Sequence, residues 1–293
     1  MATIAASSSS NDSCTTLSLK ETFLRAQEIF QALENGGNTT NASPNANDCA
    51  QMFEECSRLI RRENLFSANE TEEDLTTSTL SYLLVPGYLG KLYGGMVRVD
   101  MAAEGPAGRY KQVRRSILHF TSFLTRLDGL EMLKKEDKDF FDLDADSRKE
   151  SPDQKRARKL NDFSEERSLK EQLGTLQAQQ ARQRASGKEV DESTIRELYT
   201  VLVQSFVKAA LSGIDMGKRE LEMLEVMRER LGPRFYGASQ MERENPKLAE
   251  ARREMEERKR LAKAAEEYKN RPGLSVTHIA PDGTTKQERL KAE

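Results

Sequence analysis

The segment from Tyr110 to Leu127 carries the strongest helical pattern in the chain. Its apolar residues recur every three or four positions, at Tyr110, Val113, Ile117, Phe120, Leu124 and Leu127. This spacing places them along one face of an α-helix, and Gly105-Pro106 stands where such a helix would begin. No segment alternates apolar and polar residues for long enough to favour a sheet. The sequence therefore predicts an all-α protein.

The same spacing predicts further helices along the chain. They cover residues 17–33, 49–62, a stretch around Pro86 that ends near 94–95, and then 155–186, 195–211 and 214–231. Gly213 is expected to separate the last two helices, and Gly232-Pro233 to close the final one. Residues 134–154 read as a charge-dense linker. We expect antiparallel helical hairpins in an array of about seven helices, although no fixed repeat signature is present.

Composition divides the chain into three parts. Residues 1–16 are small and polar, so we expect them to be disordered. Residues 17–231 hold the apolar helical patterns and form the predicted packed domain. Residues 232–293 are rich in charged side chains without a continuous apolar stripe, which predicts a flexible and partly helical tail.

Charge and cysteine content exclude several classes of protein. A net charge of −2 gives no bulk attraction to nucleic acid or to an anionic membrane. No apolar run approaches the roughly 18 residues of a membrane span, and the Ser-rich start lacks the features of a signal peptide. Cys14, Cys49 and Cys56 are odd in number and widely spread, so no disulfide framework is expected. A reducing compartment, the cytoplasm or the nucleus, is predicted.

Groups suited to catalysis or metal binding are scarce. The two histidines, His119 and His278, have no cysteine or histidine partner at a suitable spacing. His119 falls inside a predicted helix, where a packing role is the favoured interpretation. Residues 142–146 (DLDAD) copy the start of a calcium loop, but Ser147 and Asp153 replace its required Gly and Glu. We therefore predict no enzyme, no metal site and no cofactor.

The basic cluster at residues 155–159 (KRARK) has two interpretations. A run of charge is usually the solvated start of a helix. Alternatively, cations on a rigid helix form a docking surface for an acidic partner, where they raise the encounter rate and fix the register. The residues alone leave both interpretations open.

Residues 64–93 combine helix-start signals with a proline in an apolar run. Asn69 is suited to cap a helix that continues through acidic residues, and Thr76 offers a second start. Pro86 removes one backbone hydrogen bond, so it is expected to bend the helix or split it.

This stretch also carries a family signature. LFS-x-NE at 65–70 and LSYLLVP at 80–86, at this spacing, resemble the alpha-4 family, which comprises immunoglobulin-binding protein 1 and its TAP-type relatives. Members regulate type 2A protein phosphatases, so the resemblance implies a tetratricopeptide-like, non-catalytic subunit that binds and protects a phosphatase catalytic subunit in TOR-type nutrient signalling. We expect a monomer when it is free. Gly87 departs from the family, which usually carries a larger residue there.

The resemblance also implies a binding site on the helix after residue 155. The family's Arg-x-x-Lys motif, followed by an apolar and then an aromatic residue, corresponds here to Arg156, Lys159, Leu160 and Phe163. We assign phosphatase binding to Arg156, Lys159 and Phe163, with Arg158 beside them. Where relatives keep basic residues next, this chain has Asp162, Ser164, Glu165 and Glu166, which lower the local positive potential. The rival hypothesis is a generic helical scaffold that binds peptides without a phosphatase link.

Overall fold

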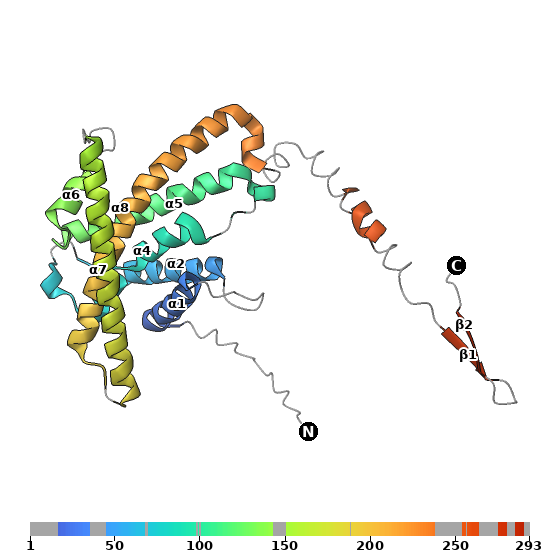
Figure 1. Cartoon of the computed structure of the whole chain (residues 1–293), viewed down its shortest axis with the longest axis horizontal. Coiled ribbons are helices and arrows are strands. Elements are labelled where there is room, and N and C mark those ends of the chain that lie inside the picture. Colours follow the sequence, from blue (N-terminus) through green and yellow to red (C-terminus); the bar gives the residue numbers. More distant parts are fainter. Residues whose placement is uncertain are drawn as a thin grey trace, which may run out of the picture.

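The structure is a computed structural model in which residues 17–35, 45–67, 70–97, 99, 101–142, 151–187, 189–237, 254–255, 257–263, 275–279 and 285–289 are described (Figure 1). Its helices are α1 (Leu19–Glu34), α2 (Ala46–Arg62), α3 (Thr77–Tyr82), α4 (Val85–Lys91), α5 (Met101–Gly129), α6 (Lys135–Asp142), α7 (Pro152–Ala185) and α8 (Glu192–Leu231). Two strands, β1 (Ser275–Ile279) and β2 (Thr285–Arg289), follow.

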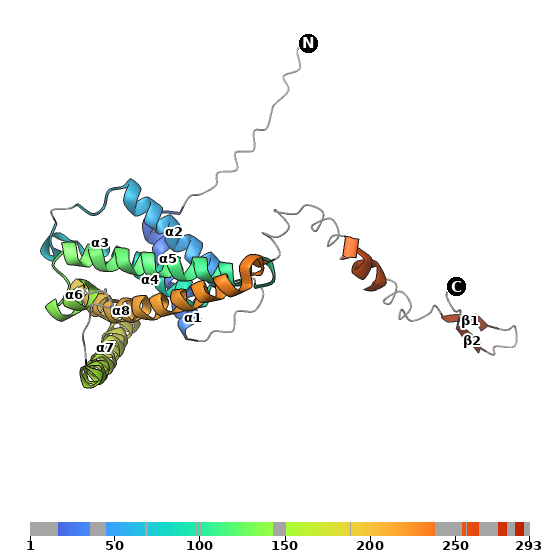
Figure 2. The same ribbon diagram turned by 90° about the horizontal axis from the view of Figure 1, so that it is seen from above.

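The helices pack as neighbouring pairs, which confirms the predicted all-α array. α1 packs on α2, α4 on α5 and α7 on α8, and α8 also runs along α5 (Figures 1 and 2). The long helix α8 therefore connects the α4–α5 pair with α7. Seen from above in Figure 2, α7 lies at the edge of the domain beside α8.

The core is built around the ring of Tyr88 in α4. Phe53 of α2 stacks on this ring at 4.7 Å, and Phe30 and Phe206 meet it edge-on at 4.7 and 4.8 Å. The buried Tyr88 hydroxyl accepts a hydrogen bond from the Gln27 side chain at 3.0 Å. Burial of the aromatic rings thus leaves no unpaired hydroxyl at the centre.

Pro86 was expected to bend its helix or to split it, and the structure shows that it splits the helix. α3 ends at Tyr82, and Pro86 lies in the first turn of α4, where its missing N–H would have no intrahelical partner anyway. Thr76 begins α3 as predicted, because its hydroxyl accepts a hydrogen bond from the Thr79 N–H at 3.1 Å. The expected cap at Asn69 lies outside the described residues.

The space beside Gly87 is filled by a ring from α8. A Cβ at this glycine would lie 2.7 Å from Cδ1 of Phe206. Phe206 is itself buried in the aromatic core. The absence of a side chain at residue 87 is therefore matched by the large residue at 206.

Gly213 does not break a helix, so this prediction was wrong. α8 runs without interruption from Glu192 to Leu231. A Cβ at Gly213 would lie 2.5 Å from Cε2 of Phe120, so the glycine lets the α5 ring lie against the α8 backbone. The predicted closing glycine, Gly232, does end the helix, with φ of 53°.

The predicted linker at 134–154 contains a helix, α6, which the sequence analysis missed. Its eight residues hold few apolar side chains. Asp137 is nevertheless buried and pairs with Lys208 of α8 at 2.8 Å, while Phe140 packs against the core. Contacts with the rest of the domain therefore stabilise α6, although its high content of charged residues is typical of a linker.

Packing continues beyond the last helix. The turn Gly232–Tyr236 folds back so that Phe235 is buried, with its ring 6.3 Å from that of Tyr110 in α5. Farther along, β1 and β2 pair antiparallel, with Ser275 opposite Arg289 and Ile279 opposite Thr285. The sequence analysis did not predict this hairpin. Among the described residues, no helix is both long and apolar enough to cross a membrane.

Candidate functional site

Helix α7 carries the residues that the sequence analysis assigned to partner binding. It begins at Pro152, three residues earlier than predicted, because Ser151 caps it. The Ser151 hydroxyl accepts from the Gln154 N–H at 3.2 Å, and the Gln154 side chain accepts from the Ser151 N–H at 2.8 Å. This reciprocal pair fixes the first turn of α7 just before the basic cluster.

One face of α7 packs on α8, and we call this contact the seam. Its residues are apolar in one part of the helix and charged in another. Leu169 and Leu176 are buried against Val201 of α8 in a small apolar cluster. Toward the N-terminus the same face continues through Asp162 and Glu165, at the helical spacing of three or four residues. The seam is thus apolar in its middle and charged near the basic cluster.

The charged part of the seam is organised by Lys208 of α8. Its ammonium lies 2.8 Å from Asp137 of α6, 2.7 Å from Glu165 and 3.6 Å from Asp162 of α7. The Lys208 side chain is 9% exposed, so these carboxylates replace water around a buried charge. Three helices meet at this one cation.

The charges at this cluster stabilise one another. Burial lowers the pKa of Lys208, but hydrogen bonding to Asp137 and Glu165 and their negative charges outweigh it, so the net shift is upward. The neighbouring ammonium in turn lowers the pKa of Glu165. Lys208 and Glu165 are therefore both charged at neutral pH.

Lys208 was missed by the sequence analysis. It stands inside the apolar run FVKAAL of α8, between Phe206 and Leu211. A lysine in the buried stripe of a helix needs a carboxylate partner, which is a signal that the sequence does contain. Its partner, Asp137, was hidden in the predicted linker.

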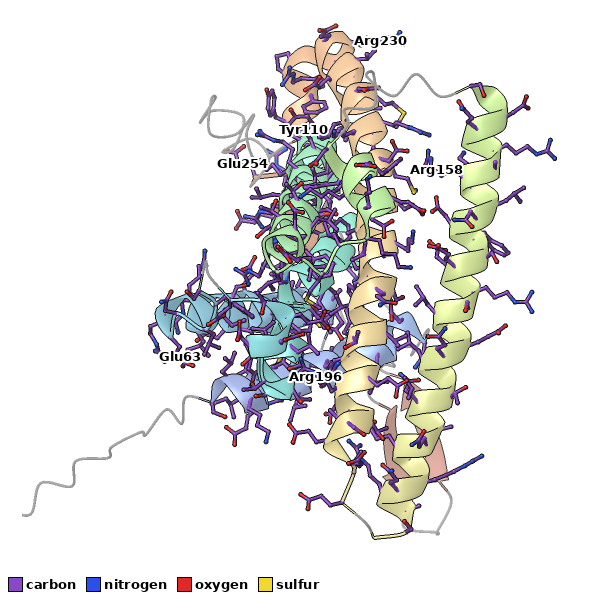
Figure 3. The ribbon with its side chains drawn as sticks, turned by 90° about the vertical axis from the view of Figure 1, so that its left-hand side faces the viewer. Glu63, Tyr110, Arg158, Arg196, Arg230 and Glu254 are labelled. Carbon is purple, nitrogen blue, oxygen red and sulfur yellow. The ribbon has the colours of Figure 1, made fainter. Side chains whose placement is uncertain are left out.

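Arg158 is the least exposed of the four predicted binding residues. Its guanidinium lies 4.3 Å from the ring centroid of Phe140 in α6 and 3.6 Å from the Asp162 carboxylate. Figure 3 labels Arg158 on α7. These contacts give Arg158 a role in holding α6 against α7.

The opposite side of α7 forms an exposed surface, the α7 outer face, made of Arg156, Lys159, Leu160 and Phe163. Leu160 is 63% exposed and Phe163 is 68% exposed, and both basic residues are exposed as well. The seam follows residues 162, 165 and 169, so Leu160 and Phe163 take no part in the packing on α8. The structure does bring Arg156, Lys159 and Phe163 together.

A groove of about 530 Å³ runs beside this face, between α6, α7 and α8. Its walls include Arg158, Lys159 and Phe163 of α7, Phe140 of α6, and Leu211 and Asp215 of α8. The α7 outer face is thus continuous with a hollow that has both apolar and charged walls.

The acids that follow Lys159 are mostly turned away from the outer face. Asp162 and Glu165 point across the seam to Lys208, which also pairs with Asp137. Glu166 is exposed and lines the groove. Asp162 lines the groove as well, so acidic side chains border the α7 outer face on the groove side.

The remaining candidates have structural roles. His119 is half-buried and stacks on Tyr93 at 5.7 Å, as a packing histidine would. Burial raises the pKa of the Cys49 and Cys56 thiols to about 12, so neither is a nucleophile at neutral pH. Within the described part of the chain, no group of acidic, His or Cys side chains is placed to hold a metal ion. Asp144 and Asp146 of the calcium-like motif lie outside that part.

Comparison with known proteins places the chain in a family. The model of the TAP42-like family matches residues 19–291. "PP2A regulatory subunit TAP46" of Arabidopsis thaliana is 28% identical over 61% of this chain and 46% of its own length. "Serine/threonine-protein phosphatase 4 regulatory subunit ppfr-4" of Caenorhabditis elegans is 26% identical over 73% of this chain and 64% of its own length. The matches thus span less than two thirds of either relative.

The fold is also found among solved structures. The chain described as "The Structure of Tap42 Alpha4 Subunit" superimposes with a TM-score of 0.54 at 20% identity. The match covers 71% of this chain and 98% of that chain. The fold and the family model agree: the chain belongs to the TAP42-like family.

Proposed function

We propose that this chain is a non-catalytic regulatory subunit that binds the catalytic subunit of a type 2A-like protein phosphatase. Its relatives in Arabidopsis thaliana and Caenorhabditis elegans, which are named as regulatory subunits of PP2A and of phosphatase 4, support this proposal. We assign the binding to the helical domain of residues 17–231.

The observation that carries the proposal is the α7 outer face. Phe163 and Leu160 are large apolar side chains left exposed beside two cations, Arg156 and Lys159. Aromatic and arginine side chains often dominate the binding energy of protein interfaces, whereas lysine at the rim steers an acidic partner. Because α7 is fixed on α8, the face is presented without prior rearrangement.

We propose that binding acts by competition. A catalytic subunit held on α7 would have part of its surface covered, and the scaffold subunit would then be excluded from that part. The chain would thereby hold a free catalytic subunit in a protected and inactive state. We further propose, on the family resemblance, a monomer that acts in the cytoplasm or nucleus in TOR-type signalling.

A charge-reversal experiment tests the binding face. In the double variant Arg156→Glu, Lys159→Glu, the affinity for a purified type 2A catalytic subunit should fall at least tenfold, which is about 1.4 kcal/mol. The matched control is Arg167→Glu, Lys170→Glu, a pair with the same spacing, also exposed, farther along the same helix. Biolayer interferometry on the full chain measures both, and circular dichroism checks that helicity is retained.

Two outcomes would contradict the proposal. Equal losses in both double variants would mean that the net charge of α7 matters and the α7 outer face does not. Affinity purification that recovers other partners, with no phosphatase catalytic subunit, would favour the generic helical scaffold. Recovery of a catalytic subunit without its scaffold subunit is the expected result.

A further inference from the structure

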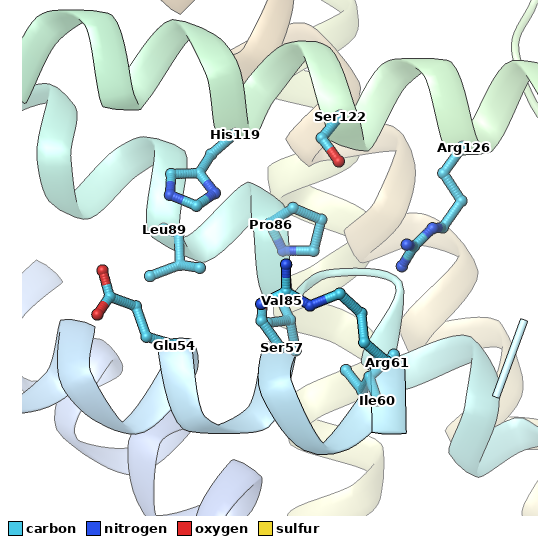
Figure 4. A pocket seen from close by; sticks show the side chains of 10 residues that line it. All are labelled: Glu54, Ser57, Ile60, Arg61, Val85, Pro86, Leu89, His119, Ser122 and Arg126. Atoms are coloured by element: carbon cyan, nitrogen blue, oxygen red, sulfur yellow. The ribbon is translucent and has the colours of Figure 1, made fainter. Parts of the chain in front are cut away.

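A second hollow, about 320 Å³ in volume, lies between α2, α4 and α5 (Figure 4). Pro86 and Leu89 of α4 and Ile60 of α2 give it an apolar floor. The volume is at the lower end of the range of about 300–1,000 Å³ found for ligand sites. It uses no residue of α7, so it is independent of the function proposed above.

Two guanidinium groups enter this hollow from different helices. Arg61 comes from α2 and Arg126 from α5, and both side chains point into the hollow in Figure 4. In the part of the chain that the structure describes, neither has a carboxylate partner. Their helix neighbours differ in this respect, because Arg58 pairs with Glu55 and Arg62 with Glu63.

The other polar groups of the hollow add donors and few opposing charges. Ser57 of α2 and Ser122 of α5 present hydroxyls, and His119 lies one turn before Ser122. Glu54 is the acid that lines the hollow, and its carboxylate already accepts a hydrogen bond from the Tyr93 hydroxyl. The hollow therefore has an excess of positive charge.

That excess has a cost in the free protein. Burial lowers the pKa of Arg126, and the positive charge of Arg61 lowers it further. Two cations held near one another without an anion repel, and an anion placed between them would remove the repulsion and be held by charge-assisted hydrogen bonds.

A neighbouring hollow of about 520 Å³ shares Ser122 and Arg126 with the first. Phe66 and Leu130 line it, and so does Leu118, which is 66% exposed. The Arg126 guanidinium lies 4.6 Å from the centroid of the Phe66 ring, at the junction of the two hollows. An apolar site thus adjoins the cationic one.

We propose that Arg61 and Arg126 bind the phosphate group of a phosphorylated serine or threonine in an extended segment of a partner protein. Two guanidinium groups and two hydroxyls offer more donors than one carboxylate can accept, whereas a phosphate dianion accepts from all of them. The apolar floor and the adjoining hollow lined by Phe66 hold the peptide residues on either side of the phosphate. Free phosphate has no such residues and would leave these apolar surfaces uncovered.

The test uses the full chain and a library of peptides with a fixed central phosphoserine or phosphothreonine and random flanks. Selected peptides should bind at least tenfold more tightly than their unphosphorylated twins, as measured by fluorescence anisotropy. The variant Arg61→Gln, Arg126→Gln should lose this difference. The matched control Arg58→Gln, Arg62→Gln removes the same charge from a neighbouring surface and should keep it. Thermal melting establishes that both variants are folded.

Further arms distinguish the source of the anion. If peptides with glutamate in place of the phosphorylated residue bind equally well, the site takes carboxylates and the proposal is overturned. If inorganic phosphate alone competes at the same concentration as the peptide, the peptide part is overturned. A library with no phosphate-dependent binding also overturns the proposal.

The ring of His119 provides a direct readout by nuclear magnetic resonance. It is one of two histidines in the chain, and it faces Glu54 and Arg61 of α2, Tyr93 and Arg115. A bound phosphopeptide should raise the pKa of His119 and leave that of His278 unchanged. Equal shifts at both histidines would indicate a nonspecific effect of the ligand and contradict the assignment.

Discussion

The ammonium of Lys208 lies 2.8 Å from the carboxylate of Asp137, and both side chains are about 10% exposed or less. The pair joins α8 to a helix that the charge pattern of the sequence concealed. Two further acids of α7 complete the contact, so Lys208 joins the apolar cluster of Leu169 and Leu176 in holding the helix that carries the α7 outer face.

Replacing that lysine should destabilise the domain strongly. Lys208→Met leaves Asp137 buried without its partner, which typically costs about 3–5 kcal/mol. Denaturation by urea, followed by circular dichroism, measures the free energy of unfolding. The matched control is Lys138→Met, which breaks the exposed pair between Lys138 and Asp128 and should have a far smaller effect. Similar losses in the two variants would show that burial of the Lys208 pair is unimportant.

The same cluster predicts a dependence of stability on pH. Because its folded-state pKa is lowered, Glu165 contributes stability that is present above its ordinary value of 4.5 and lost as the pH falls through the folded pKa. The free energy of unfolding should decrease below pH 4.5, and less steeply in Glu165→Gln than in the native chain. The raised pKa of Lys208 contributes stability that is fully present below pH 10.5 and is lost as the pH rises through the folded-state pKa. If the free energy of unfolding fell equally steeply below pH 4.5 in both proteins, the ion pair between Glu165 and Lys208 would not contribute to stability.

The exposed and buried apolar residues of α7 should respond differently to truncation. Phe163→Ala should change the free energy of unfolding by less than about 0.5 kcal/mol, since the ring touches little of the domain, while reducing phosphatase binding. Leu176→Ala removes a buried side chain from the contact with α8 and should cost about 2–5 kcal/mol. Thermal melting and biolayer interferometry together separate the two effects. A large loss of stability in Phe163→Ala would mean that the ring belongs to the packed seam.

Two glycines offer a comparison of packing with helix propensity. Gly213→Ala introduces a Cβ that would clash with the ring of Phe120, so we expect destabilisation of about 1–3 kcal/mol. Gly174→Ala in α7 meets no atom within 4 Å and should stabilise by about 0.5–1 kcal/mol. Chemical denaturation measures both. Stabilisation by both substitutions would show that the ring of Phe120 moves aside freely.

Sequence periodicity predicted most of the helices because each buries a continuous apolar stripe. It failed where a contact with a distant part of the chain determines the local structure. Gly213 reads as a helix breaker, yet it serves the close approach of Phe120, a residue far away in the chain. The segment that forms α6 reads as a linker, since its stability comes from a partner on α8.

The candidate binding site was also predicted only in part. Arg156, Lys159 and Phe163 follow from the family resemblance, and the structure gathers them on one face. The way α7 packs on α8 beside the basic cluster did not follow from the sequence, because the seam there is made of Asp162 and Glu165. Hydrophobic periodicity does not register a seam of charged residues. The lysine in the apolar stripe of α8 signals a buried carboxylate, but it does not say which one.

The small apolar cluster between α7 and α8 shares no buried residue with the large core around Tyr88. We therefore expect helix α7 to open locally, with a free energy that its own contacts determine. We expect its backbone amides to exchange with solvent faster than those of α5, without global unfolding. Such an opening would also carry away the outer face, so the strength of the α7–α8 contact sets the fraction of molecules that are competent to bind.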